Sequence, residues 1–222
     1  MLTRDNIKNG VLHDMIKAGG ALLPLLSDEE LETSWSQTLA AQPNDHHGDI
    51  WVFGYGSLIW NPAFHFVEKR IARLNGYHRC FCLWTHLGRG TPERPGMVLG
   101  LERGGSCVGV AFRIAAKAVA DEVEIIWRRE MVSGAYLPRW TRLSTEEGAV
   151  TAVSFVINPD HPRYACKPPE QDVVTSLAHA TGPLGAAREY LDNTVSHLDE
   201  LGIHDRALRR LGRLVSEKAD AA

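Results

Sequence analysis

The chain of 222 residues has no strong excess of charge of either sign and no long hydrophobic run. Its formal net charge is -3, with acidic and basic residues interspersed, so we expect no binding to nucleic acid or to an anionic membrane. A membrane-spanning helix needs about 18 consecutive apolar residues, and the chain has no such run. Its first ten residues also lack the charged-then-apolar order of a signal peptide. These absences predict a cytoplasmic protein whose partner is a small molecule.

Cysteines are few, at positions 80, 82, 107 and 166, which fits a reducing compartment better than a disulfide framework. Cys80 and Cys82 would share one face of a strand, so the two thiols together are a conceivable metal pair. No second CxC or CxxC accompanies them, and no histidine lies nearby in helical register. We therefore expect buried, reduced thiols and no metal site. The pair His46-His47 is interpreted as part of a solvated linker over 42–49.

The common nucleotide-binding and serine-hydrolase motifs are missing from the most distinctive stretch, WVFGYGSLIW at 51–60. It has no third glycine for a Rossmann fingerprint, no Gly-Lys-Ser/Thr for a Walker motif, and no G-x-S-x-G around Ser57. Instead, an apolar run meets Gly54 and Gly56 on either side of Tyr55. This pattern predicts a core strand that opens into a turn whose N–H groups, with the Ser57 hydroxyl, could bind an anion such as a carboxylate. A plain tight turn is the alternative.

Apolar periodicity and turn residues predict an α+β protein. Helices are expected over 3–18 and 27–39, the second with a capping box formed by Ser27 and Glu30. Three hairpins are expected to join 66–74 to 77–86 across Asn75-Gly76, 97–103 to 107–114 across Gly104-Gly105, and 139–144 to 150–157 across 146–148. With the lead strand they predict a mostly antiparallel, barrel-like sheet that holds a small ligand at its mouth.

Three helices are expected to close the chain. They follow Pro168-Pro169, cover 186–201, and begin at an Asp205 cap. We interpret their apolar stripes, which include Tyr190, as packing faces without a chemical role.

The segment 87–96, LGRGTPERPG, is too long and too rich in glycine, proline and arginine for a minimal connection. Loops of this kind often cover or form binding sites. Arg89 and Arg94 are candidates to clamp a substrate carboxylate, because a guanidinium can bind both of its oxygens. The alternative is that both side chains are solvated.

A helix over 116–132 carries an unexpected carboxylate. Val119, Val123 and Ile126 recur at the spacing of one helical face, and the next position on that face is Glu130. Burial and the negative end of the helix dipole would both raise the pKa of Glu130 towards neutrality, as a general base requires. A structural ion pair with Arg128 or Arg129 is the alternative.

Together these motifs closely resemble the ChaC family of γ-glutamylcyclotransferases that act on glutathione, and its bacterial branch most. The resemblance covers nearly the whole chain. The motifs are FGYGSLIWNP at 53–62, GRGT at 88–91, WRREM at 127–131, GAYLPRW at 134–140, HPRY at 161–164 and GPLG at 182–185. The resemblance implies a cyclotransferase-like β-barrel over 49–222, preceded by a helical extension over 1–48 that shorter members lack.

The resemblance also implies a lyase reaction, in which the γ-glutamyl α-amine attacks the γ-carbonyl and gives 5-oxoproline and Cys-Gly. It makes Glu130 the general acid/base, places Tyr136 and Tyr164 near the pocket, and leaves Arg89 for the glycyl carboxylate. The substrate-binding stretch would comprise Phe53, Gly54, Tyr55, Gly56, Ser57 and Leu58. No cofactor or metal is implied, and monomer and dimer both stay open.

Two other functions remain compatible with the sequence. The first is a cyclotransferase for other γ-glutamyl amino acids or amines. The second is a non-catalytic regulator of cation transport, although a regulator has no need of a carboxylate at the position of Glu130.

Overall fold

The computed structural model describes residues 2–18, 25–43 and 48–221, with a closed five-stranded barrel at its centre. The strands pair in the order β1-β3-β2-β4-β5, and a parallel pairing of β5 with β1 closes the barrel. The other pairings are antiparallel. The bounds are β1 Ile50–Gly54, β2 Glu68–Thr85, β3 Gly96–Ile114, β4 Tyr136–Thr145 and β5 Gly148–Ile157. The expected α+β fold with a mostly antiparallel barrel is confirmed.

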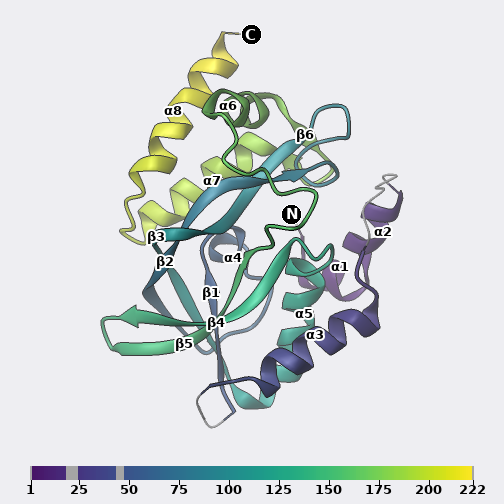
Figure 1. Cartoon of the computed structure of the whole chain (residues 1–222), viewed down its shortest axis with the longest axis vertical. Coiled ribbons are helices and arrows are strands. Elements are labelled where there is room, and N and C mark those ends of the chain that lie inside the picture. The colour runs from purple at the N-terminus through teal and green to yellow at the C-terminus, as the bar shows by residue number, and fades with distance from the viewer. Residues whose placement is uncertain (1, 19–24, 44–47, 222) are drawn as a thin grey trace.

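Two groups of helices flank the barrel on opposite sides (Figure 1). The C-terminal group comprises α6 Glu170–His179, α7 Ala187–Glu200 and α8 Arg206–Asp220. The other group comprises α1 Arg4–Lys8, α2 Val11–Ala18, α3 Asp28–Ala40 and α5 Val119–Glu130, the last preceded by the 3-10 turn η1 Ala116–Ala118. The remaining elements are the single turn α4 Ser57–Trp60 and a small ribbon of β6 Thr181–Gly182 and β7 Gly185–Ala186. None of the helices in the described part of the chain is long and apolar enough to cross a membrane.

Strand β1 is buried on both faces, which explains its unbroken apolar sequence. Trp51 and Phe53 pack in the cluster that includes the C-terminal helices, and Ile50 and Val52 pack in the cluster that includes α5. The two helical layers therefore meet the same strand from opposite sides. The turn after β1 lies where these layers converge.

The first two expected hairpins are wrong, because β2 and β3 are continuous strands that pair along almost their whole length. Asn75 pairs with Ser106 and Tyr77 with Arg103, so Gly76 stands opposite Gly104-Gly105 as a bulge. The φ angles of these three glycines, 84°, 105° and 68°, lie in the left-handed region, so both strands can bend at one level. The connection between β2 and β3 is instead the glycine- and arginine-rich loop over 86–95.

Most other local predictions are confirmed. Strands β4 and β5 form the third hairpin, Ser27 and Glu30 form a capping box on α3, and Asp205 caps α8. The single helix expected over 3–18 is wrong, because it breaks at Asn9 and Gly10 into α1 and α2. The pair His46-His47 lies outside the described residues.

Candidate functional site

The turn that follows β1 is held in place from several directions. The carbonyl of Tyr55 accepts a hydrogen bond of 2.7 Å from Arg79, and the Tyr55 hydroxyl donates one of 2.9 Å to the Phe155 carbonyl. Gly56 lies so close to α7 that an added Cβ would be 2.9 Å from the Tyr190 hydroxyl. The turn thus needs glycine for close packing, and α4 starts immediately after it at Ser57.

Arg129 joins this turn to the carboxylate predicted on α5. Its guanidinium donates to the Ser57 hydroxyl at 2.8 Å and to the Asn61 carbonyl. Its Nε also lies 3.0 Å from Oε1 of Glu130. The ion pair considered as an alternative for Glu130 is therefore present, and it orients the carboxylate next to the turn.

Glu130 completes an otherwise apolar helix face, as expected. Val123 and Ile126 on that face are fully buried, and the Glu130 side chain is 14% exposed. Burial raises the pKa of Glu130, and the neighbouring charge of Arg129 lowers it without cancelling the effect of burial. The carboxylate therefore holds a proton more readily than an ordinary glutamate does.

The turn and Glu130 share a small recess of about 20 Å³. Its lining consists of Tyr55, Gly56, Ser57, Leu58, Leu99, Glu130, Tyr136, Phe155 and Tyr190. Ser57, Glu130, Tyr136 and Tyr190 also line a larger cavity of about 450 Å³, so the recess adjoins that cavity. A volume of this size is within the range typical of small-molecule sites.

Three phenols surround the recess, of which Tyr55 and Tyr190 are buried and Tyr136 is partly buried. Burial raises the pKa of Tyr55, of Tyr136 and, to about 12, of Tyr190, so all three stay uncharged at neutral pH. The Tyr136 hydroxyl donates to the Leu99 carbonyl at 2.7 Å. Sequence reasoning gave Tyr190 only a packing role, because its position in the apolar stripe of α7 gives no sign that it reaches the site.

The remaining predicted residues take different positions. Arg89 is buried and lines the larger cavity, where it donates to Glu189 at 2.6 Å and to the Ala186 carbonyl at 3.1 Å. Arg94 is exposed and lies outside the lining of both cavities. Phe53, Gly54 and Tyr164 also lie outside these linings, so their contact with a substrate stays a prediction.

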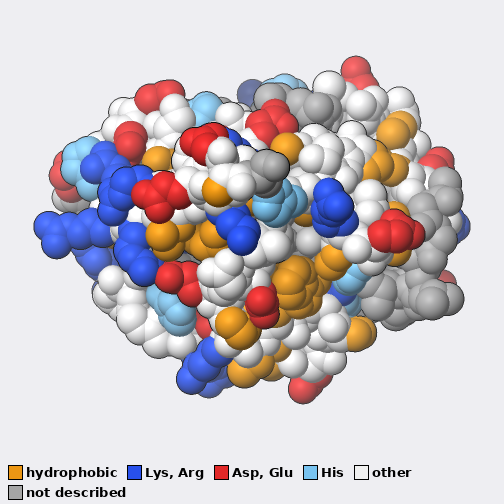
Figure 2. Space-filling model, turned by 90° about the horizontal axis from the view of Figure 1, so that it is seen from above, with side chains coloured by type: hydrophobic (Ala, Val, Ile, Leu, Met, Phe, Trp, Pro, Cys, Tyr) orange, Lys and Arg blue, Asp and Glu red, His pale blue; other side chains and the backbone are white. Residues whose placement is uncertain are grey.

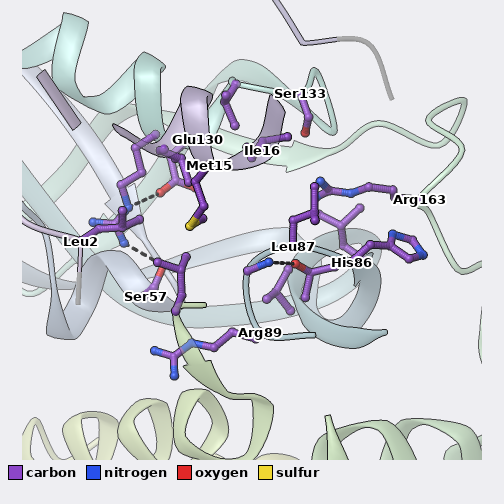
Figure 3. Close-up of a pocket in the computed structure, with 18 of the residues that line it drawn as sticks. Leu2, Met15, Ile16, Ser57, His86, Leu87, Arg89, Glu130, Ser133 and Arg163 are labelled. Atoms are coloured by element: carbon purple, nitrogen blue, oxygen red, sulfur yellow. Dashed lines mark hydrogen bonds and ion pairs between the residues drawn. The ribbon is translucent and has the colours of Figure 1, made fainter. Parts of the chain in front are cut away.

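The N-terminal helices contribute a cavity wall that sequence reasoning missed. Leu12, Met15 and Ile16 of α2 line the larger cavity, together with Leu2 and Leu25. Figure 3 shows Leu2, Met15 and Ile16 on the same side of the pocket as Glu130. No periodic signal distinguishes these residues from ordinary packing residues, because the wall exists only once α1 packs against α5 and α2 packs against α1.

In the described part of the chain, a group of side chains outside the cavities has metal-ligand chemistry. Ligand atoms of His78, Cys80 and Glu102 all lie within 4.8 Å of one another. His78 and Cys80 are two residues apart on β2, and His78 pairs directly with Glu102 on β3. Glu102 also accepts a hydrogen bond of 2.7 Å from the Tyr164 hydroxyl. His78 lies outside helical register with Cys80, and it is the strand repeat of two that puts both residues on one face of β2.

One face of the molecule carries charges of both signs (Figure 2), as the interspersed charges of the sequence predict. On the face shown in Figure 2, acidic, basic and hydrophobic side chains are mixed, and basic side chains gather towards one end.

Comparison with known proteins identifies relatives over nearly the whole chain. Residues 50–218 match the model of the ChaC-like protein family. The glutathione-specific gamma-glutamylcyclotransferase of Escherichia coli (strain K12) is 41% identical over 98% of this chain and 93% of its own length. Glutathione-specific gamma-glutamylcyclotransferase 1 of Rattus norvegicus is 32% identical over 71% of this chain and 75% of its own.

A solved structure supports the same fold. The crystal structure of a selenomethionine-labelled gamma-glutamyl cyclotransferase specific to glutathione, from yeast, superposes with a TM-score of 0.72. The match covers 77% of this chain and 96% of the yeast chain, at 21% sequence identity. At that identity the likeness concerns the barrel and its helices.

Proposed function

The chain belongs to the ChaC-like protein family, and we propose that it is a glutathione-specific γ-glutamylcyclotransferase. This enzyme is a lyase that splits glutathione into 5-oxoproline and Cys-Gly. The names of its relatives, at 41% and 32% identity, support the reaction and the substrate. The observation that carries the proposal is the recess in which the turn and Glu130 meet.

In this proposal the γ-glutamyl group lies in the part of the larger cavity that adjoins the recess, and the Cys-Gly part lies further out in the same cavity. Backbone N–H groups of Tyr55 to Leu58 hold the α-carboxylate or the oxyanion that forms at the γ-carbonyl. The Ser57 hydroxyl, which already accepts from Arg129, can donate its own hydrogen to the same group. The neutral phenols of Tyr136 and Tyr190 exclude water from the reacting atoms.

Glu130 moves the protons. Its carboxylate takes a proton from the α-ammonium group, and the freed amine attacks the γ-carbonyl to close a five-membered ring. The bond from the γ-carbon to the cysteine nitrogen then breaks as Glu130 gives this proton to the departing nitrogen. Glu130 carries the second proton from the ring nitrogen to the departing amine in the same way. The attacking nitrogen loses two protons in total and the departing nitrogen gains two, so no other reactant is consumed. Because the amine and the carbonyl belong to the same substrate molecule, the enzyme has only to hold the rotatable bonds between them in the attack geometry.

The outer cavity is proposed to contact the Cys-Gly part of the substrate. Arg89 forms one wall, held by Glu189, and the extension over 1–48 supplies the apolar residues opposite. Residues 49–222 then form the cyclotransferase domain, and the extension completes its pocket. This division agrees with the start of the family match at residue 50.

We place this reaction in the cytoplasm with no cofactor. All four cysteines are free thiols, which fits a compartment where glutathione is abundant and reduced. Ring closure by an amine of the substrate requires only positioning and proton transfer.

The test is turnover of glutathione by the purified protein, with 5-oxoproline and Cys-Gly both measured. Glu130→Gln should keep the fold and lower kcat by about 10²- to 10⁴-fold, the usual contribution of general acid/base catalysis. Glu124→Gln is the matched control, because Glu124 lies on the same helix but does not line the recess. Its Oε1 lies 2.8 Å from Nε of Arg128. A Glu130→Gln protein with full activity would remove Glu130 from the mechanism.

γ-Glutamyl-alanine as a second substrate separates the proposed specificity from a general γ-glutamyl cyclotransferase. Equal kcat/KM values for the two substrates would favour the broader enzyme. No turnover of either peptide would favour a non-catalytic role.

A further inference from the structure

Three arginines line the larger cavity, and two of them are already engaged by the protein. Arg129 binds Ser57, Asn61 and Glu130, and Arg89 binds Glu189 and Ala186. The third is Arg163. Among the described residues, none accepts a hydrogen bond from its guanidinium or forms an ion pair with it, and its Nε is buried without a partner.

The backbone of Arg163 is firmly fixed. Its carbonyl accepts from the Trp84 amide at 2.9 Å, and the adjacent Tyr164 forms a β-bridge with Leu83. Its own N–H donates to Nδ1 of His161 at 3.2 Å, and Nε2 of His161 lies 2.9 Å from the Ser133 carbonyl. The segment 161–164 is therefore attached to the end of β2 and to the loop after α5. The guanidinium is thus presented to the cavity from a rigid support.

The electrostatics of this region favour an anion. A partly buried cation without a counter-charge is costly, and a bound carboxylate would offset that cost. Burial lowers the pKa of Arg163, but an arginine remains charged at neutral pH. His86 lines the cavity too, and burial, together with the charge of Arg163, lowers its pKa, so the ring stays neutral. A neutral imidazole carries no negative charge to offset that of Arg163. Glu130 is already paired with Arg129.

The position of Arg163 matches the far end of a short peptide. Figure 3 shows Ser57 and Glu130 at one side of the pocket and Arg163 at the other, with Arg89 below Ser57. A tripeptide whose γ-glutamyl group lies against the recess carries its second carboxylate at its opposite end. The fork of a guanidinium binds a carboxylate through two parallel hydrogen bonds.

We propose that Arg163 is the receptor for the C-terminal carboxylate of the substrate, which in glutathione is the glycyl carboxylate. This inference rests on the proposed function for the placement of the γ-glutamyl end. It replaces the expectation that Arg89 clamps this carboxylate, because Arg89 is held by Glu189 as part of the wall. Arg163 then helps to select peptides with a free C-terminus of the right length.

The test compares glutathione with its C-terminal carboxamide, which lacks only the negative charge. The wild-type protein should prefer glutathione by about tenfold or more in kcat/KM, the size expected for a charge-assisted bidentate contact. Arg163→Gln should raise KM for glutathione by the same factor, leave kcat nearly unchanged, and leave KM for the carboxamide unchanged. Arg163→Lys keeps the charge but loses the fork, so its preference should be intermediate.

Arg103→Gln is the control for loss of a positive charge, because Arg103 is exposed on β3 outside the cavities. A preference for glutathione that persists in Arg163→Gln, or that disappears in Arg89→Gln instead, would overturn the inference and leave the proposed reaction intact.

Calorimetric binding of the two peptides to the Glu130→Gln protein makes the same comparison without turnover. If the wild-type protein does not turn over glutathione, only the proposed function is contradicted. If the Glu130→Gln protein binds the two peptides equally, or binds neither, the role of Arg163 is contradicted.

Discussion

At the scale of single residues, the pairing of Glu130 with Arg129 decides how the carboxylate can act. An ion pair alone would hold Glu130 ionised and make it a poor proton acceptor. Arg129, however, divides its donors among Glu130, the Ser57 hydroxyl and the Asn61 carbonyl. Burial outweighs the remaining attraction, and the pKa of Glu130 stays raised. The contact with Arg129 thus orients the carboxylate, whereas burial supplies its basicity.

The raised pKa predicts a specific pH dependence. Glu130 must be ionised to accept a proton, so kcat/KM should fall on the acidic side with an apparent pKa above 4.5, the ordinary value for a glutamate. Measuring kcat and kcat/KM for glutathione as a function of pH gives the apparent pKa of this acidic decrease. An acidic limb at or below 4.5 would show that Glu130 is not the group that titrates.

The same shift has a consequence for stability with a definite sign. The folded protein binds the proton of Glu130 more tightly than the unfolded chain does. The contribution of this group to stability is therefore fully present below the unfolded pKa and is lost as pH rises through the folded pKa. Urea unfolding of the wild type and of Glu130→Gln at several pH values should show this loss in the wild type only.

At the scale of elements, the junction of β1 and α4 forms the site because α7 packs directly against it. Trp60 of α4 donates to Thr194 of α7 at 3.1 Å, and the rings of Trp60 and Tyr190 pack edge to face with centroids 5.8 Å apart. Gly56 leaves just enough room for the Tyr190 hydroxyl. The geometry of the turn therefore depends on a helix more than 120 residues further along the chain.

This packing predicts that Gly56→Ala lowers activity through a steric conflict. The new Cβ would lie 2.9 Å from the Tyr190 hydroxyl, so we expect a loss of about 1–3 kcal/mol in unfolding free energy and at least tenfold in kcat/KM. Adding Tyr190→Phe removes the conflicting oxygen and should restore part of the lost stability. Chemical unfolding and turnover of the single and double variants measure both effects, and strictly additive losses would contradict the steric explanation.

At the scale of the whole molecule, the N-terminal extension is attached through a buried carboxylate. The side chain of Glu122 in α5 is only 4% exposed. Its two carboxylate oxygens accept hydrogen bonds from both terminal guanidinium nitrogens of Arg4, whose side chain is 28% exposed. The backbone and ring of His65 each contact Glu122 at 3.0 Å. The Leu2 carbonyl also accepts from the Asn61 side chain at 2.9 Å, which joins the extension to the residues after the substrate turn.

Arg4→Met should therefore weaken both the fold and the pocket. It leaves Glu122 with fewer donors, and we expect a loss of about 1–3 kcal/mol in unfolding free energy. KM for glutathione should rise more than kcat falls, because the wall formed by α2 loosens while the recess stays intact. Lys8→Met on the same helix is the control, since Lys8 is exposed. Urea unfolding and steady-state kinetics of the two variants provide the measurements, and identical behaviour would show that the Arg4–Glu122 pair does not secure the wall.

The sequence by itself determined the features that depend on nearby residues. The buried strand and its glycine turn, the capping box on α3, the Asp205 cap on α8, and the position of Glu130 on an apolar helix face all follow from short-range spacing. Each of these signals is contained in one turn of helix or one strand. The backbone hydrogen bonds and side-chain directions that produce them also act only between residues close together in the sequence.

The tertiary structure decided everything that depends on a distant partner. Asn75-Gly76 could form a hairpin turn, but pairing of β2 with β3 along the barrel satisfies more backbone hydrogen bonds, so it becomes a bulge opposite Gly104-Gly105. Tyr190, Arg163 and the N-terminal leucines reach the cavity only after the helices pack. The spacing of residues within a helix or strand sets the face on which a side chain lies. Closure of the barrel and packing of the helices decide which distant residues that side chain contacts.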